Sequence, residues 1–148
     1  GERKLARVTI DGPPTWPAMP SMAVQQGRVR FKLVLTTPAH FNAHWLPLGF
    51  ERIKQDEISM WRGELKDIPC DIVSGCIGKP VKTGGWDMVN NAPRADEAVV
   101  PAGSVYFCEA DASAEPALRK LHGKQIGEHT QYGFGQVLIG TWTWETRT

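Results

Sequence analysis

The pattern of apolar and polar residues predicts four β-strands in this chain. The first stretch alternates apolar and polar side chains, then becomes apolar, and stops at Pro38. In the third stretch, Pro101 and Gly103 indicate a sheet edge or a bulge, because both residues interrupt a regular strand ladder. The predicted strands cover residues 29–37, 70–78, 98–108 and 134–144.

Helical patterns between the first two strands are weak. Residues 40–53 mix aromatic and polar side chains, and their proline and glycine predict a loop that leads to a short or irregular helix. Residues 57–67 place Ile58, Trp61 and Leu65 at helical spacing, although a glycine within the segment weakens this pattern. We therefore expect one poorly formed helical region before the second strand.

A better helix signal lies between the third and the fourth strand. Ser113 is a suitable N-cap, and Pro116 lies in the first turn, where its missing N–H is not needed. Ala117, Leu118 and Leu121 then form an apolar stripe, and the histidine–glycine pair that follows ends the helix.

The order of these elements predicts an α+β domain with the ferredoxin-like (RRM-like) βαββαβ arrangement. In this interpretation, residues 28–148 form the domain, and residues 79–97 are a long polar insertion between strands two and three. Residues 1–27 are rich in proline and predict an extended lead-in to the domain. Enzymes, metal carriers and RNA-binding domains share this architecture, so the fold alone does not assign a function.

Composition narrows the class of protein without identifying it. A chain of 148 residues with 41% hydrophobic residues fits one folded domain, and it has no apolar run long enough for a membrane span. The three cysteines are odd in number and lack a CxxC spacing, which favours a reduced, cytoplasmic protein with cysteines as small core residues. A net charge of +1 excludes attraction to nucleic acid through bulk positive charge, so any RNA site must be local.

The segment Ile126–Gly135, before the last predicted strand, carries the clearest chemical signal. Three of its ten residues are glycines, which suit backbone that turns sharply or approaches a ligand closely. We expect main-chain amides around these glycines to hold phosphates, but the loop can equally be a tight turn. For Phe134 the core-facing interpretation is the stronger one, because a residue that opens a strand more often faces the core. The candidate RNA-binding residues of this loop are Lys124, Gly127, His129, Gly133, Phe134 and Gly135.

The insertion at residues 79–97 is the second candidate region for RNA binding. It is either an unstructured surface loop or a functional one, and Lys79, Lys82 and Arg94 offer positive charge to an RNA backbone. Trp86 either stacks on a base or is a buried anchor in its Gly-Gly-Trp-Asp context. All four side chains are candidates for RNA binding.

His40 and His44 are the candidates for metal binding or catalysis. Their spacing of four would place both on one face of a helix, as in many metal sites, but no suitably spaced third ligand is evident. We therefore predict no metal and no other cofactor. Either histidine could act as a general base in RNA cleavage, although nothing in the sequence supplies an evident oriented partner.

Several motifs together resemble a known superfamily. The glycine-rich segment, which ends in Gly-Phe-Gly before the last strand, resembles the C-terminal loop of the RAMP superfamily of CRISPR-associated proteins. The resemblance extends over Gly84–Asp87, Val100–Phe107 and Leu121–Gly123. Together these segments are similar to the C-terminal domain of the type III-B (Cmr) effector subunit that binds the 5′ tag of CRISPR RNA, over about residues 29–144.

This resemblance implies a non-catalytic RNA-binding subunit, whose glycine-rich loop holds the 5′ tag and whose insertion acts as a thumb on the guide–target duplex. The implied partners are CRISPR RNA, the large polymerase-like subunit and a backbone RAMP subunit. Target cleavage is not expected, because the loop after the first strand lacks the Asp that cleaving backbone subunits use. Two alternatives stay open. One is a metal-independent CRISPR RNA-processing endoribonuclease with His40 or His44 as its base, and the other is a structural module whose loop contacts only protein.

Overall fold

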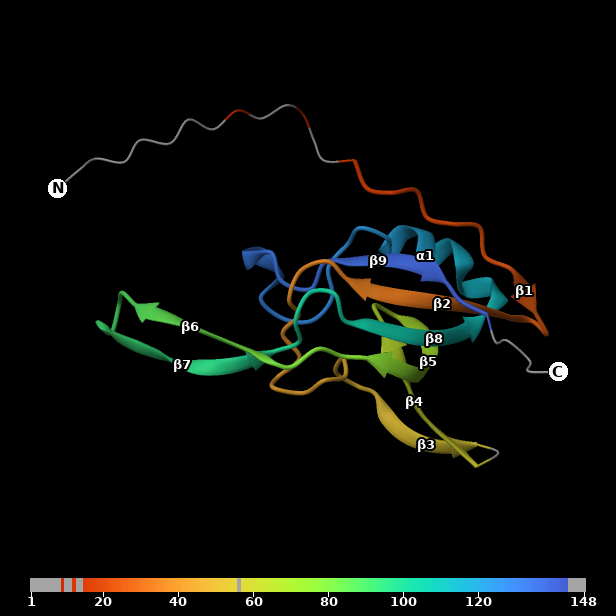
Figure 1. The fold of residues 1–148 in the computed structure, drawn as a ribbon, viewed down its shortest axis with the longest axis horizontal. Coiled ribbons are helices and arrows are strands. Elements are labelled where there is room, and N and C mark those ends of the chain that lie inside the picture. Colours follow the sequence, from red (N-terminus) through yellow and green to blue (C-terminus); the bar gives the residue numbers. More distant parts are fainter. Residues whose placement is uncertain (1–8, 10–11, 13–14, 56, 144–148) are drawn as a thin grey trace.

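The computed structural model describes residues 9, 12, 15–55 and 57–143 (Figure 1). Within this part of the chain, seven strands form one antiparallel sheet in the order β1-β2-β8-β5-β4-β3, with β9 paired to β2. The other two strands, β6 and β7, form a separate sheet. The strands are β1 (Val24–Gln25), β2 (Arg28–Leu35), β3 (Glu51–Gln55), β4 (Ile58–Leu65), β5 (Ile68–Cys76), β6 (Val81–Asp87), β7 (Ala92–Val99), β8 (Val105–Asp111) and β9 (Val137–Thr141). The helices are α1 (Glu115–Leu121) and the 3₁₀ helices Ala112–Ala114 and Thr130–Tyr132.

The central strand β2 confirms the period-two pattern of its sequence. The four alternate residues from Val29 to Leu35 are buried, and the residues between them face the other side of the sheet. β8 continues this apolar face with the buried side chains of Tyr106 and Cys108. Helix α1 lies beside β9 and adds Leu118 to the same core (Figure 1).

The α+β class is confirmed, but the structure does not show the βαββαβ arrangement. The helix predicted over residues 57–67 is wrong, because this segment forms β4, which pairs with both β3 and β5. Its apolar residues do not share one face, since Ile58 is exposed and Leu65 is buried. Residues 40–50 contain no helix either, and they lead directly into β3.

The second predicted helix is confirmed as α1, but its N-cap is Ala114, which makes no side-chain cap bond, and the side-chain cap belongs to the 3₁₀ turn before it. Asp111 precedes the 3₁₀ turn before α1, and its Oδ1 accepts hydrogen bonds from the Ser113 amide (2.9 Å) and the Ser113 hydroxyl (2.6 Å). These bonds hold the pKa of Asp111 below its ordinary value. Ser113 is therefore a donor to the cap and not the N-cap itself. No helix within the described residues is long and apolar enough to cross a membrane.

Two strand boundaries differ from the prediction for local reasons. The segment 98–108 is divided between β7 and β8, because Gly103 has a φ of 85° in the turn that separates them. The Gly103 amide donates to the carbonyl oxygen of Leu35 at 2.8 Å, which holds this turn against β2. The last strand begins at Val137 and not at Phe134, and residue 144 lies outside the described residues.

The insertion at residues 79–97 is an ordered β-hairpin. β6 and β7 pair from Val81↔Val99 to Asp87↔Ala92 and extend away from the main sheet (Figure 1). At its tip, Asp87 accepts hydrogen bonds from the amides of Val89 (2.9 Å) and Asn90 (3.1 Å). Hydrogen bonds from the Asn90 side chain and these amides lower the pKa of Asp87. The hairpin is therefore a structured projection and not a loose loop.

Part of the proline-rich segment packs on the domain. β1 pairs with the start of β2, and Met22 is buried in the core. Nε2 of His122 lies 2.8 Å from the carbonyl oxygen of Pro17. The prolines at positions 13 and 14 lie outside the described residues.

Two of the three cysteines are core residues, as predicted. Cys70 and Cys108 are buried, whereas Cys76 is exposed, which corrects the prediction for that residue. All three are free thiols. Burial raises the pKa of Cys70 to about 12 and raises the pKa of Cys108 well above its ordinary value, so both thiols stay protonated at neutral pH.

Candidate nucleic-acid interface

The glycine-rich loop folds back on the segment that follows β2. Gly127 and Gly135 have φ values of 80° and 76°, in the left-handed region that favours glycine. A Cβ on Gly127 would lie 2.6 Å from the His40 carbonyl oxygen, and one on Gly135 would lie 1.8 Å from the Ile126 carbonyl oxygen. The packing of the loop itself therefore requires these two glycines.

Two main-chain amides of this loop are used within the fold. The Gly135 amide donates to the carbonyl oxygen of Pro38 at 2.7 Å, and the Gly133 amide donates to that of Thr130 at 3.0 Å. Each amide therefore already has an acceptor, which corrects the expectation that these two groups hold phosphates. The chemistry that the loop offers to a ligand lies in its side chains.

A cavity of about 610 Å³ lies between the glycine-rich loop and the β6–β7 hairpin, and we call it the loop–hairpin cavity. It brings together His129 and Phe134 of the loop, Arg94 of the hairpin, and His40. Its remaining lining residues are Thr83, Gly84, Asp87, Ala95, Glu97, Gln131 and Tyr132. Sequence reasoning missed most of these residues, because their proximity depends on how the hairpin lies over the loop.

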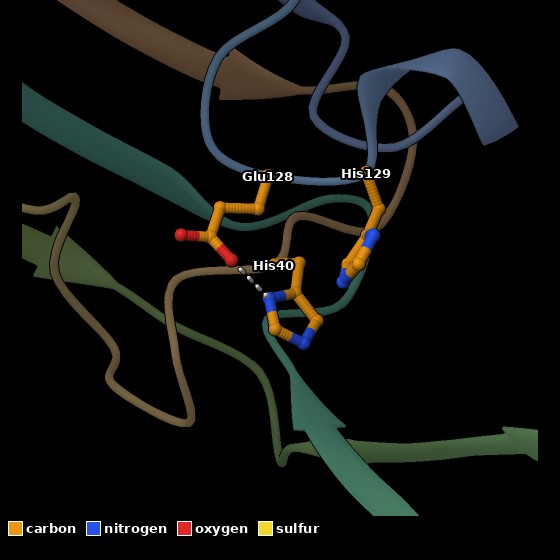
Figure 2. Close-up of side chains that lie close together, drawn as sticks. All are labelled: His40, Glu128 and His129. Atoms are coloured by element: carbon orange, nitrogen blue, oxygen red, sulfur yellow. Dashed lines mark ion pairs between the residues drawn. The ribbon is translucent and has the colours of Figure 1, made fainter. Parts of the chain in front are cut away.

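His40 is the most constrained side chain of the cavity, with only 6% of its side chain exposed. Its Nε2 lies 2.6 Å from Oε2 of Glu97 on β7. Its Nδ1 lies 3.8 Å from Oε2 of Glu128 (Figure 2) and has no hydrogen-bond partner among the described residues. The ring of His129 meets the His40 ring edge-to-face, with 4.7 Å between the ring centroids. His40 therefore has the oriented carboxylate partner that sequence reasoning did not find.

His44 does not share this site. Its Nδ1 accepts a hydrogen bond from the Leu46 amide at 3.4 Å, and it lines a separate hollow beside Pro80. Because residues 40–50 contain no helix, the spacing of four between His40 and His44 does not place them on one helix face.

The cavity has aromatic surfaces at its loop side. Tyr132 is 68% exposed, and its ring lies 6.1 Å from the His129 ring at an interplanar angle of 32°. Phe134 is half-buried and lines the cavity. Flat rings with one free face can stack on unpaired bases, which is how many proteins hold single-stranded RNA.

The remaining candidates lie outside the cavity lining. Lys79 and Lys82 are exposed near the base of the hairpin, and Trp86 is 52% exposed, so it is not a buried anchor. Lys124 lines another hollow, beside Lys120 of α1. The structure therefore gathers some of the predicted RNA-binding side chains in one cavity and disperses the others.

An ion-pair network that sequence reasoning missed lies on the face of the sheet opposite the core. Asp71 is 5% exposed and accepts hydrogen bonds from Arg62 (2.7 and 3.2 Å) and Arg28 (2.9 Å). Burial by itself raises the pKa of Asp71, but the two guanidinium groups outweigh it and hold this pKa below its ordinary value. A second ion pair on this face joins Nε of Arg30 to Oε1 of Glu109 at 2.8 Å.

Comparison with known proteins adds one finding. The model of a family described as CRISPR-associated protein (Cas_Cmr3) matches residues 1–142. No curated protein and no solved structure matches the chain. The family match covers nearly all of the sequence and includes both the loop and the hairpin, so this chain belongs to the Cas_Cmr3 family of CRISPR-associated proteins.

Proposed function

We propose that this chain is a RAMP-type domain that binds CRISPR RNA without cleaving it, inside a type III-B (Cmr) effector complex. Family membership supports the association with CRISPR and Cmr proteins. The loop–hairpin cavity is the observation that carries the RNA-binding part, because it joins aromatic and cationic side chains from both regions that sequence reasoning selected. We assign the 5′ tag of the CRISPR RNA to this cavity.

The side chains of the cavity suit an unpaired nucleotide. Tyr132, His129 and Phe134 offer ring faces or edges for base stacking, and Arg94 offers a guanidinium group for a phosphate. Gln131 can donate and accept hydrogen bonds on a base edge. With this arrangement, a chain with a net charge of +1 can bind RNA locally.

The hairpin tip suits contact with a duplex. Met88 and Val89 are 84% and 92% exposed, and Trp86 is half exposed on the same hairpin. Exposed apolar side chains at a rigid tip can insert between base steps and unstack them. We therefore assign to the hairpin a contact with the guide RNA or with its duplex with the target. The large polymerase-like subunit and the backbone RAMP subunit would contact other surfaces of the domain.

The test compares two arginine variants of the chain. Arg94→Ala removes the guanidinium group of the cavity, whereas Arg52→Ala removes an exposed one on β3 that donates to Ser59 at 2.9 Å. We expect Arg94→Ala to weaken binding of tag-bearing CRISPR RNA by about tenfold and to lower the salt slope of binding by about 0.7. Fluorescence anisotropy at several salt concentrations measures both quantities, and Arg52→Ala leaves both unchanged.

Assembly provides the second measurement. The chain should enter a complex with the Cmr partner subunits and CRISPR RNA, as followed by size-exclusion chromatography. Absence of RNA affinity at low salt, together with absence from the assembled complex, contradicts the proposal. Assembly that proceeds equally well without RNA favours the structural-module alternative.

The endoribonuclease remains a second candidate because of one observation. Glu97 lies 2.6 Å from Nε2 of His40 and is the oriented partner that a histidine base needs. Against it, the His40 side chain is only 6% exposed, so a ribose hydroxyl has little access to it. Cleavage of CRISPR repeat RNA in EDTA that is lost in His40→Ala and kept in Arg52→Ala would establish this candidate.

A further inference from the structure

His40, Glu128 and His129 form a cluster of possible metal ligands at the wall of the loop–hairpin cavity. Each residue offers one ligand atom, and these atoms lie within 4.8 Å of one another (Figure 2). We propose that this cluster binds a divalent transition-metal ion of the Zn²⁺ class. The proposal does not rest on RNA binding by the chain.

His40 has a buried ring nitrogen without a hydrogen-bond partner among the described residues. Its Nδ1 is buried, and the nearest carboxylate oxygen, Oε2 of Glu128, is 3.8 Å away, which is too far for a hydrogen bond. A buried polar atom without a partner is costly and uncommon in folded proteins. A cation between the imidazole and the carboxylate would satisfy both groups at once.

The orientation of the His40 ring also suits a metal ligand. A carboxylate of Glu97 can only accept a hydrogen bond, so its contact with Nε2 at 2.6 Å places the ring proton on Nε2. In the neutral imidazole the lone pair is then on Nδ1, which faces Glu128. Metal-bound histidines commonly donate their other ring N–H to a carboxylate in this way, which fixes the tautomer.

The backbone brings together the segments that carry the ligands. The Glu128 amide donates to the His40 carbonyl oxygen at 3.0 Å, and these two residues form an isolated antiparallel bridge. His129 has a φ of 57°, a left-handed conformation that is uncommon for histidine. The bridge holds the two ligand-bearing segments together. The Glu128 side chain is 42% exposed, and its Oε1 accepts a hydrogen bond from Nδ2 of Asn42 at 3.2 Å, which leaves Oε2 to face His40.

The ligand set selects the class of metal. Two imidazoles and one carboxylate are typical of Zn²⁺ sites, at distances of about 2.0–2.2 Å, whereas Mg²⁺ and Ca²⁺ prefer oxygen ligands alone. The three ligand atoms lie within 4.8 Å of one another, and movement of the exposed Glu128 side chain would bring its carboxylate to such a distance from an ion bound by the imidazoles. Because His40 and His129 line the cavity, a water molecule or a phosphate oxygen can complete the coordination.

The chain is prepared without an affinity tag and treated with a chelator. It is then titrated with ZnCl₂, followed by isothermal titration calorimetry, and with CoCl₂, followed by visible absorption. We expect one ion per chain and a Co²⁺ absorption band typical of nitrogen and oxygen ligands. Glu128→Gln removes the carboxylate, and His129→Asn removes an imidazole while keeping a residue that tolerates a positive φ. Each of these substitutions should weaken Zn²⁺ binding by at least about tenfold. Glu97→Gln should weaken it by about 10- to 100-fold, because it removes the carboxylate that orients the His40 ring.

Two matched variants are the controls. His44→Ala removes a histidine outside the cluster, and Glu57→Gln removes a carboxylate that is 90% exposed. Both should leave Zn²⁺ affinity unchanged, and circular dichroism checks that all variants fold. The proposal is overturned if the wild-type chain binds no Zn²⁺, or if Glu128→Gln and a folded His129→Asn bind it as the wild type does. If His129→Asn does not fold, Glu128→Gln alone decides.

Discussion

The loop–hairpin cavity and the charged face of the main sheet differ in how their polar groups are satisfied. On the sheet, Asp71 accepts hydrogen bonds from Arg28 and Arg62, so the charges stabilise one another. In the cavity, Nδ1 of His40 has no hydrogen-bond partner among the described residues and lies 3.8 Å from Oε2 of Glu128. Nε of Arg28 on the sheet also lacks a hydrogen bond, but it lies 3.4 Å from Oε2 of Glu109 within the ion-pair network. Paired charges contribute to the fold, whereas unpaired groups beside an open cavity are available to a ligand.

The largest effect on stability is expected at the glycine-rich loop, where close packing requires glycine. Gly135→Ala places a Cβ 1.8 Å from the Ile126 carbonyl oxygen at a φ of 76°, so the loop must move. We expect a loss of about 3 kcal/mol or more in the free energy of unfolding. Gly133→Ala, with a φ of 89° and no atom within 4 Å of the added Cβ, should cost only about 1 kcal/mol. Urea unfolding measures both, and equal losses would contradict the steric explanation.

The next largest effect is expected on the sheet. Asp71→Asn removes the charge that two arginines share, and we expect a loss of about 2 kcal/mol in unfolding free energy with unchanged RNA affinity. Asp67→Asn, an exposed residue in the β4–β5 turn, is the control and should be nearly neutral. A fall in RNA affinity for a folded Asp71→Asn would mean that the sheet face also binds RNA.

The opposite behaviour is expected in the cavity. Tyr132→Ala removes an exposed ring, so it should lower RNA affinity by about fivefold, or about 1 kcal/mol, with little change in unfolding free energy. Tyr132→Phe keeps the ring and should retain most of the affinity. Anisotropy titrations and urea unfolding on the same samples separate the two quantities, and equal affinities for the two variants would exclude stacking by this residue.

The smallest effect is a pH dependence of the sheet network. The folded-state pKa of Asp71 is depressed, so its stabilisation is present above about pH 4 and is lost as the pH falls through that folded-state pKa. We expect a shallower acid-side loss of stability in Asp71→Asn than in the wild type. Urea unfolding between pH 7 and pH 3 tests this, and parallel curves would show that Asp71 is not the group responsible.

Parts of the fold were predictable because their signals are local. The alternation in β2 and the apolar stripe of α1 each depend on a few neighbouring residues, and both elements formed as predicted. β4 was missed because its pairing with β3 and β5 overrides a helical spacing. Gly63, which weakens the helical pattern, has its reason in the sheet, since a Cβ there would lie 2.8 Å from the Phe50 ring and glycine permits this close approach.

The apolar pattern of the central strands, the glycines that the loop before β9 requires, and the resemblance to CRISPR-associated proteins that the family match confirmed can all be read from the sequence. What surrounds that loop depends on the tertiary structure. Glu97 reaches His40 across a separation of 57 residues, and Arg94 and His129 line the same cavity because an ordered hairpin lies beside the loop. Such contacts depend on strand pairing and close packing between distant segments, which residue spacing does not encode.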